Sequence, residues 1–213
     1  SVRSVHLVTG DPRIPWEIVH LGPEGRENFL CLHVALSRWL PVAYPAASEI
    51  GIQSILAARA GDGSNQSPDL PSSESEISLL QGWSEDDPEV EIEALDPASS
   101  REMLDHLEQG NWDLVHFAGH GDVDSENANR SALIFDDASI TALQLTEKRL
   151  AKVRQQRPMV FLNACRTGRS GWSLTGLGGW PDRWIRRGRC GALLCPQWKV
   201  RDSRAAAFAT GVY

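Results

Sequence analysis

Apolar and polar positions from residue 51 onward follow two different periods. Short apolar or alternating runs bounded by turn residues predict strands, and apolar residues spaced three or four positions apart predict helices. The expected strands are 51–58, 90–95, 112–118, 132–135, 159–163 and 191–194, and the expected helices are 75–83, 99–109 and 142–154. Strands and helices therefore alternate along this part of the chain.

This alternation predicts an α/β fold. A strand that is followed by a helix and a parallel strand needs a right-handed crossover, which places the helices on the faces of a mostly parallel sheet. Ligands of such sheets collect at the carboxyl ends of the strands, where the loops meet. We therefore look for functional residues directly after the strands.

The first 48 residues differ from the rest of the chain in their pattern, because prolines interrupt them. These prolines are Pro12, Pro15, Pro23, Pro41 and Pro45. We expect residues 1–48 to form an N-terminal part packed on a core of residues 49–213. The chain reads as a segment of a larger protein, with the core truncated at its C-terminus.

Composition narrows the function classes. The 213 residues are 41% hydrophobic and 23% charged, which is ordinary for a globular protein, and the net charge of −7 argues against direct nucleic-acid binding. No apolar run is long enough to span a membrane. Four scattered cysteines lack the spacing of a disulfide framework, so a cytoplasmic location is expected. No metal or cofactor motif is evident, since Cys190 and Cys195 only flank an apolar strand.

Two residues with complementary chemistry follow two of the predicted strands. His120 stands between Gly119 and Gly121 just after strand 112–118, and Cys165 comes just after strand 159–163. A neutral imidazole can accept a thiol proton near pH 7, and the amide of Gly121 is a natural donor to an oxyanion. Taken singly, each residue is more typical of a structural position. Together they predict a thiol and a base at one edge of the sheet.

The sequence around both residues resembles a known family. His-Phe-Ala-Gly-His-Gly at 116–121 and Leu-Asn-Ala-Cys-Arg-Thr-Gly at 162–168 are similar to two motifs of CHAT domains, caspase-like (clan CD) cysteine peptidases related to separases. The resemblance implies a cysteine endopeptidase with a Cys–His dyad. His120 would be the base and later the acid, Cys165 would form the thioester, and the amides of Gly121 and Cys165 would hold the oxyanion.

The resemblance also implies a substrate pocket. Trp-Lys-Val-Arg-Asp at 198–202 resembles a separase pattern whose acid binds a basic P1 residue, so Asp202 and Trp198 become candidate substrate-binding residues. Cleavage after Arg or Lys is expected. Asp202 is equally suited to capping the last helix. Asn163 either faces the same pocket or is hydrogen-bonded structurally.

Partners follow from the resemblance as well. It implies a protein substrate, an activating sensor domain or partner protein, and a role in bacterial defence or cell death. An alternative is a catalytically silent caspase-like scaffold or regulatory module. A serine hydrolase of the α/β type is excluded, because residues 168–172 (Gly-Arg-Ser-Gly-Trp) lack the final glycine of Gly-x-Ser-x-Gly.

Overall fold

The structure is a computed structural model. It describes residues 2–11, 14–22, 28–61, 70–122, 124, 126–164, 167, 171–173 and 176–213. The chain forms two compact units, residues 1–45 and residues 46–213. Within the described residues, no helix has both the length and the apolar content needed to cross a bilayer.

The first unit is built on a pair of parallel strands. Its elements are β1 (Ser4–Val8), a 3₁₀ turn (Trp16–Ile18), α1 (Leu30–His33) and β2 (Ala35–Trp39). Arg38 on β2 binds both carboxylate oxygens of Glu17 through Nη2, at 2.6 and 2.8 Å. This bidentate contact fixes the 3₁₀ turn against the strand pair. That this part packs on the core stays a prediction.

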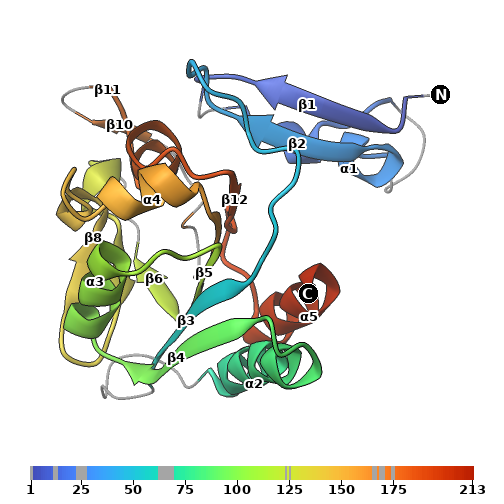
Figure 1. Cartoon of the computed structure of the whole chain (residues 1–213). Helices are drawn as coiled ribbons and strands as arrows, with labels where there is room; N and C mark the ends of the chain where they lie inside the picture. The colour runs from blue at the N-terminus through green and yellow to red at the C-terminus, as the bar shows by residue number, and fades with distance from the viewer. Residues whose placement is uncertain are drawn as a thin grey trace. The chain divides into compact units, whose positions relative to one another are not determined.

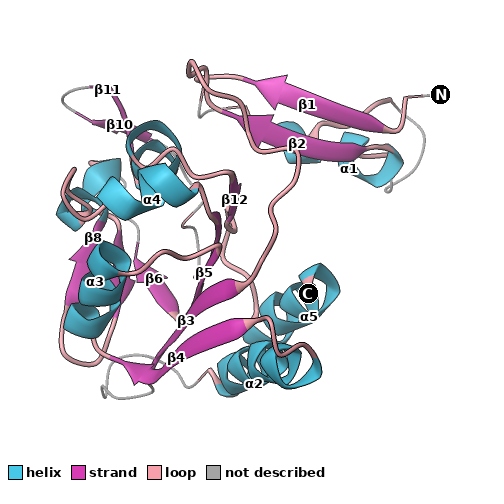
Figure 2. Cartoon of the chain, in the orientation of Figure 1, coloured by secondary structure: helices cyan, strands magenta, loops and turns pink. Residues whose placement is uncertain are grey.

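The second unit contains a five-stranded sheet in which every strand pair is parallel. In spatial order the strands are β12 (Ala192–Leu194), β9 (Met159–Asn163), β5 (Leu114–Ala118), β3 (Ser54–Ala60) and β4 (Glu91–Ala98). Figure 2 shows the strands side by side with helices around them. The predicted α/β fold with a mostly parallel sheet is confirmed, and it is the caspase-like arrangement.

Helices cover both faces of this sheet (Figure 1). α2 (Pro71–Asp86) and α5 (Asp202–Val212) lie on one face, and α3 (Ser100–Gln109) and α4 (Ala151–Gln156) lie on the other. Alternate residues of β3 point to opposite faces. Ile55 and Ala57 accordingly join Ile77 and Leu80 of α2 in one buried apolar cluster. Burial on both faces explains why β3 and β5 are mostly apolar rather than alternating, with Arg59 and His116 as buried polar exceptions.

Smaller elements follow the central strands. β6 (His120–Asp122), β7 (Ala132–Ile134) and β8 (Ser139–Thr141) form an antiparallel sheet, and β10 (Gly171–Ser173) pairs with β11 (Gly176–Gly178). The remaining turns are 3₁₀ at Ala128–Arg130 and Ala142–Gln144, and π-helical at Asp182–Arg187. β6 matters most for the site because a single residue, Gly119, separates it from the end of β5.

The helix predicted at 142–154 is wrong in its length. The structure has a 3₁₀ turn at Ala142–Gln144 and then the short helix α4, which begins at residue 151. The Gln144 side chain accepts from the Thr141 amide at 2.6 Å and closes the first turn separately. Leu145 and Leu150 are both 1% exposed. Two separate turns thus bury Leu145 and Leu150, whereas Leu143, which also suggested a single helix, is 48% exposed.

Candidate functional site

The carboxyl ends of β5 and β9 lie side by side in the central sheet. Ala118, the last residue of β5, is paired with Asn163, the last residue of β9, and the Gly119 amide donates to the Asn163 carbonyl at 3.3 Å. His120 follows at once as the first residue of β6, opposite Ile134 of β7, and is partly exposed. The structure therefore places the predicted base at this edge.

The space around residue 119 explains why this position is a glycine. A Cβ at this position would lie 2.7 Å from Cζ of Phe117 and 2.9 Å from Cβ of Ala60. The Phe117 ring is fully buried, so it has no room to withdraw. Glycine lets the chain leave β5 through this tight gap and present His120 on the next strand.

Cys165 lies outside the described residues, as does Arg166. The residues on either side are well anchored. Ala164 and Thr167 are both 2% exposed, and the Thr167 hydroxyl donates to the carbonyls of Leu162 and Ala164 at 3.0 and 2.8 Å. Ala164 and Thr167, the described residues nearest to Cys165 in the sequence, are thus both buried just after the end of β9.

Gly121, the predicted oxyanion donor, lies on β6 beside His120. It is paired with Leu133 of β7 and is partly exposed. The second predicted donor is the amide of Cys165, which falls outside the described residues. Donation by these two amides stays a prediction.

A pocket opens at the same edge of the sheet. Its empty volume is about 350 Å³ including the part open to solvent, and its walls come from α2, α5 and the ends of β5 and β9. The lining residues are Leu70, Ser73, Glu76, Ala118, Gly119, Asn163, Pro196, Val200, Asp202 and Ala205. Two of the three predicted substrate-binding residues, Asn163 and Asp202, therefore share one pocket. The third, Trp198, is not among the lining residues, and its side chain is 45% exposed.

Asp202 has a second role besides lining the pocket. Its Oδ2 accepts a hydrogen bond from the Ser72 amide at 3.0 Å. Ser72 is in the first turn of α2, where backbone amides have no partner within the helix. Asp202 thus lines a pocket and also caps a helix, which is α2 rather than the predicted α5, and its binding of substrate stays a prediction.

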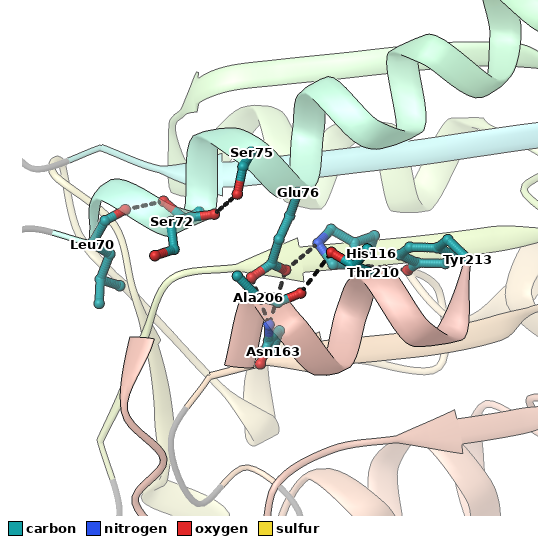
Figure 3. A network of polar contacts seen from close by, with 10 residues as sticks. Leu70, Ser72, Ser75, Glu76, His116, Asn163, Ala206, Thr210 and Tyr213 are labelled. Carbon is teal, nitrogen blue, oxygen red and sulfur yellow. Dashed lines mark hydrogen bonds and ion pairs between the residues drawn. The ribbon is translucent and has the colours of Figure 1, made fainter. Parts of the chain in front are cut away.

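Sequence reasoning missed the acid at the inner end of the pocket. Glu76 of α2 is only 3% exposed and lines the pocket. The Asn163 amide nitrogen donates to its Oε1 and Oε2 at 2.8 and 2.9 Å, and Nε2 of His116 lies 3.1 Å from Oε2, outside good hydrogen-bond geometry. Figure 3 shows Glu76 reaching from the helix between His116 and Asn163. One carboxylate thus links α2 to both strands of the site.

Tyr213 completes the network on its far side. The Tyr213 hydroxyl lies 2.8 Å from Nδ1 of His116, which is fully buried. Burial, and after it the charge of Glu76, raise the pKa of Tyr213, so the hydroxyl keeps its proton. Nδ1 of His116 thus faces the Tyr213 hydroxyl, and Nε2 faces the Glu76 carboxylate. Figure 3 shows the three side chains in this order.

One sequence signal points to Glu76. The buried residues of α2 are Ser73, Glu76, Ile77 and Leu80, which follow the spacing of a helix face that packs on a sheet. A glutamate in such a stripe is uncommon unless it is paired. Its partners, His116 and Asn163, lie 40 and 87 residues away, so the stripe alone does not identify them.

The other cysteines differ from Cys165 in what they can do. Cys190 is completely buried, and this burial raises the pKa of its thiol and makes it unreactive. Cys31 is exposed and Cys195 is partly exposed. A thiol reagent will therefore meet Cys31 as well as any reactive thiol of the site.

Comparison with known proteins gives one finding about the family. The model of the CHAT domain family matches residues 12–213, which is nearly the whole chain. No curated protein matches the chain.

Proposed function

Because the chain belongs to the CHAT domain family of caspase-like proteins, we propose that it is a cysteine endopeptidase with Cys165 as nucleophile and His120 as general base. The proposal includes cleavage after a basic P1 residue. It also includes a protein substrate and control by a partner or sensor domain in the cytoplasm.

One observation of the fold supports the proposed pairing of Cys165 with His120. β5 and β9 are neighbouring parallel strands, and their carboxyl ends lead directly to His120 and to the Ala164–Thr167 segment. A base and a nucleophile that follow adjacent strands are delivered to the same edge of the sheet. Residues of both strand ends, among them Gly119 and Asn163, line one pocket. This supports the proposal that the pocket holds a substrate side chain.

The proposed chemistry has two steps. His120 accepts the thiol proton of Cys165 while sulfur bonds to the scissile carbonyl carbon; the C–N bond then breaks, and His120 gives the proton to the leaving amine. Water, deprotonated by His120, attacks the thioester, and the proton returns to the thiolate as the acid leaves. The amides of Gly121 and Cys165 would stabilise the oxyanion in both steps.

The basic P1 preference is supported by the charge of the pocket. Two carboxylates, from Glu76 and Asp202, and the amide of Asn163 contribute to its lining. Among the described residues that line it, none is Lys or Arg. A pocket with this lining favours a cation over an anion or an apolar side chain.

The regulatory part of the proposal rests on the family resemblance alone. It implies a peptidase that is switched on by a sensor domain or a bound partner, in bacterial defence or cell death. The alternative is a caspase-like scaffold without activity. The experiment below separates these two functions.

The test is cleavage of a peptide library by the full-length protein, with its activating partner where one is found. We expect cleavage after Arg or Lys that is lost in Cys165→Ala and in His120→Ala. Cleavage after other residues, still lost in both variants, would keep the dyad and remove the basic preference. Absence of cleavage under every activating condition would favour the scaffold.

Labelling of the thiol gives an independent measurement. Cys31 is exposed and Cys195 is partly exposed, so both can react with iodoacetamide and the experiment needs a background with Cys31→Ser and Cys195→Ser. In that background we expect rapid labelling that disappears in Cys165→Ala and slows in His120→Ala, because the imidazole raises the thiolate fraction. Labelling that is equally slow in all three proteins would contradict an activated thiol.

A further inference from the structure

We propose that Glu76 supplies the negative charge that selects the basic P1 side chain, an inference that rests on the proposed peptidase function. The sequence pattern points to Asp202 for this task. The contacts of the two carboxylates favour Glu76, which is the more deeply buried of the two and pairs with no Lys or Arg among the described residues, its one ring contact being to His116.

The position of Glu76 is that of a pocket floor. It is 97% buried yet still lines the pocket, together with Ala118 and Asn163 at the strand ends. Its carboxylate lies against the sheet, held by the Asn163 amide (Figure 3). A side chain that enters from the open end would meet Asp202 and Ala205 of α5 first and Glu76 last.

The charge of Glu76 is poorly compensated without a ligand. Its partners are a neutral amide and the His116 ring, at 3.1 Å without good hydrogen-bond geometry. No Lys or Arg of the described residues forms an ion pair with it, and Arg59 on the same face pairs with Asp96 and Glu74 instead. A buried carboxylate is costly unless a cation or several donors offset it. A guanidinium or ammonium group from the substrate would supply that offset.

Asp202 is less available for the same task. Its Oδ2 is bound to the Ser72 amide at the start of α2, and the partial positive charge of that helix end already balances the carboxylate. Asp202 is only partly buried, so solvent screens its charge. We therefore assign it to shaping the pocket mouth by holding α2.

A purely structural role for Glu76 is the competing explanation. In that case the carboxylate only ties α2 to β5 and β9. Glu76→Gln distinguishes the binding role from the structural role. The Asn163 side-chain amide can flip so that its oxygen accepts from the new Gln amide. The tie is then kept and only the charge is removed.

The experiment compares two peptides that differ only at P1, Arg in one and the uncharged isostere citrulline in the other. We expect the wild-type kcat/KM ratio for Arg over citrulline to fall about 30-fold or more in Glu76→Gln. Glu85→Gln is the matched control, since Glu85 is exposed near the far end of the same helix. It should leave the ratio unchanged.

A second variant keeps the test decisive if Glu76→Gln folds poorly. Ala205→Lys adds a cation at the mouth of the pocket without altering Glu76, His116 or Asn163. We expect it to lower the Arg preference in the same direction. Calorimetric binding of agmatine, a guanidinium compound that is not cleaved, should weaken about tenfold or more in both variants and not in Glu85→Gln.

The outcomes distinguish this inference from the peptidase proposal. Suppose that Glu76→Gln changes neither the Arg-to-citrulline ratio nor agmatine binding, while Asp202→Asn loses both. This result would overturn the role of Glu76 and keep the basic preference. Wild-type cleavage after uncharged residues that needs Cys165 would overturn Glu76 selection and keep the peptidase. No cleavage by wild type would overturn both.

Discussion

Two carboxylates at opposite edges of the central sheet, Glu76 and Asp113, differ in how completely the protein satisfies them. Asp113 directly precedes β5 at the amino edge. Its Oδ2 accepts from the amides of Gln53 and Ser54 and from the Ser54 hydroxyl at 3.0–3.1 Å, and Oδ1 accepts from Gln156 at 2.7 Å. Glu76 at the other edge has one amide donor and a poorly aligned imidazole.

The difference separates a structural carboxylate from one suited to binding. Partial burial of Asp113 opposes ionisation, but hydrogen bonds from Gln156, Gln53 and Ser54 outweigh it and lower the pKa. All of its partners belong to the protein, and they join β3, β5 and the end of α4. Glu76 has fewer donors, is more deeply buried and borders a pocket. The Glu76 carboxylate can accept further hydrogen bonds, and it borders the pocket that a ligand would enter.

The largest expected loss of stability comes from truncating Glu76. Glu76→Ala removes the acceptor of the Asn163 amide and leaves a cavity beside the fully buried His116 ring, so we expect the free energy of unfolding to fall by about 3–4 kcal/mol. Glu76→Gln should cost much less, about 1 kcal/mol, because Asn163 can still bond to it. Urea denaturation of both variants measures the difference. Equal losses would mean that the charge, and not the hydrogen bonds, stabilises this edge.

Gly119→Ala should have the next largest effect. The new Cβ meets the buried Phe117 ring and Ala60 at distances below 3 Å, so the strand end must move. We expect a loss of about 2 kcal/mol, together with a large fall in kcat because His120 is displaced. Chemical denaturation and peptide cleavage measure the two effects. A variant with normal stability and normal activity would show that this gap between β5 and β3 is wider than the structure has it.

Asp113→Asn should cost less and depend on pH. We expect a loss of about 1–2 kcal/mol at pH 7, since the amide keeps an acceptor oxygen but loses the charge-assisted bonds. The folded pKa of Asp113 lies below the unfolded value of about 3.9. Its stabilising effect is therefore complete above the unfolded value and is lost as pH falls through the folded one.

The measurement is the unfolding free energy of wild type and Asp113→Asn at several pH values. The two curves should be parallel from about pH 5 to 7 and approach each other as the pH falls below the unfolded pKa of about 3.9. Peptidase activity at pH 7 should be nearly unchanged, because this edge is remote from the pocket. A constant difference at all pH values would show that the effect comes from the amide group itself rather than from the lost charge.

The sequence predicted the sheet well because burial on both faces leaves a strong signal. β5 and β9 appear as mostly apolar runs, and their ends correctly placed His120 and Asn163 at one edge of the sheet, while the position of Cys165 stays a prediction. The split at 142–154 could not be predicted. Several leucines in this segment suggested one helix, and only the contacts of Gln144 show where the first turn closes.

The polar network behind the pocket could not be predicted from the sequence, for a different reason. Glu76, His116 and Asn163 come from three elements, and Tyr213 comes from a fourth. Periodicity places each residue on its own helix or strand but does not show which faces meet. Asp202 illustrates the same limit, because its capped partner is the start of α2, 130 residues away in the chain.

The smallest expected effect, a gain in stability, comes from Gly82→Ala in the second half of α2. A Cβ at this position meets nothing within 4 Å, in contrast to Gly119 at the opposite edge of the sheet. Alanine restricts the unfolded chain and suits the helix interior, so the free energy of unfolding should rise by about 0.5–1 kcal/mol. Thermal and urea unfolding measure it, and the Arg-to-citrulline ratio should stay at the wild-type value. A fall in that ratio would mean that the whole of α2, and not only its pocket end, positions Glu76.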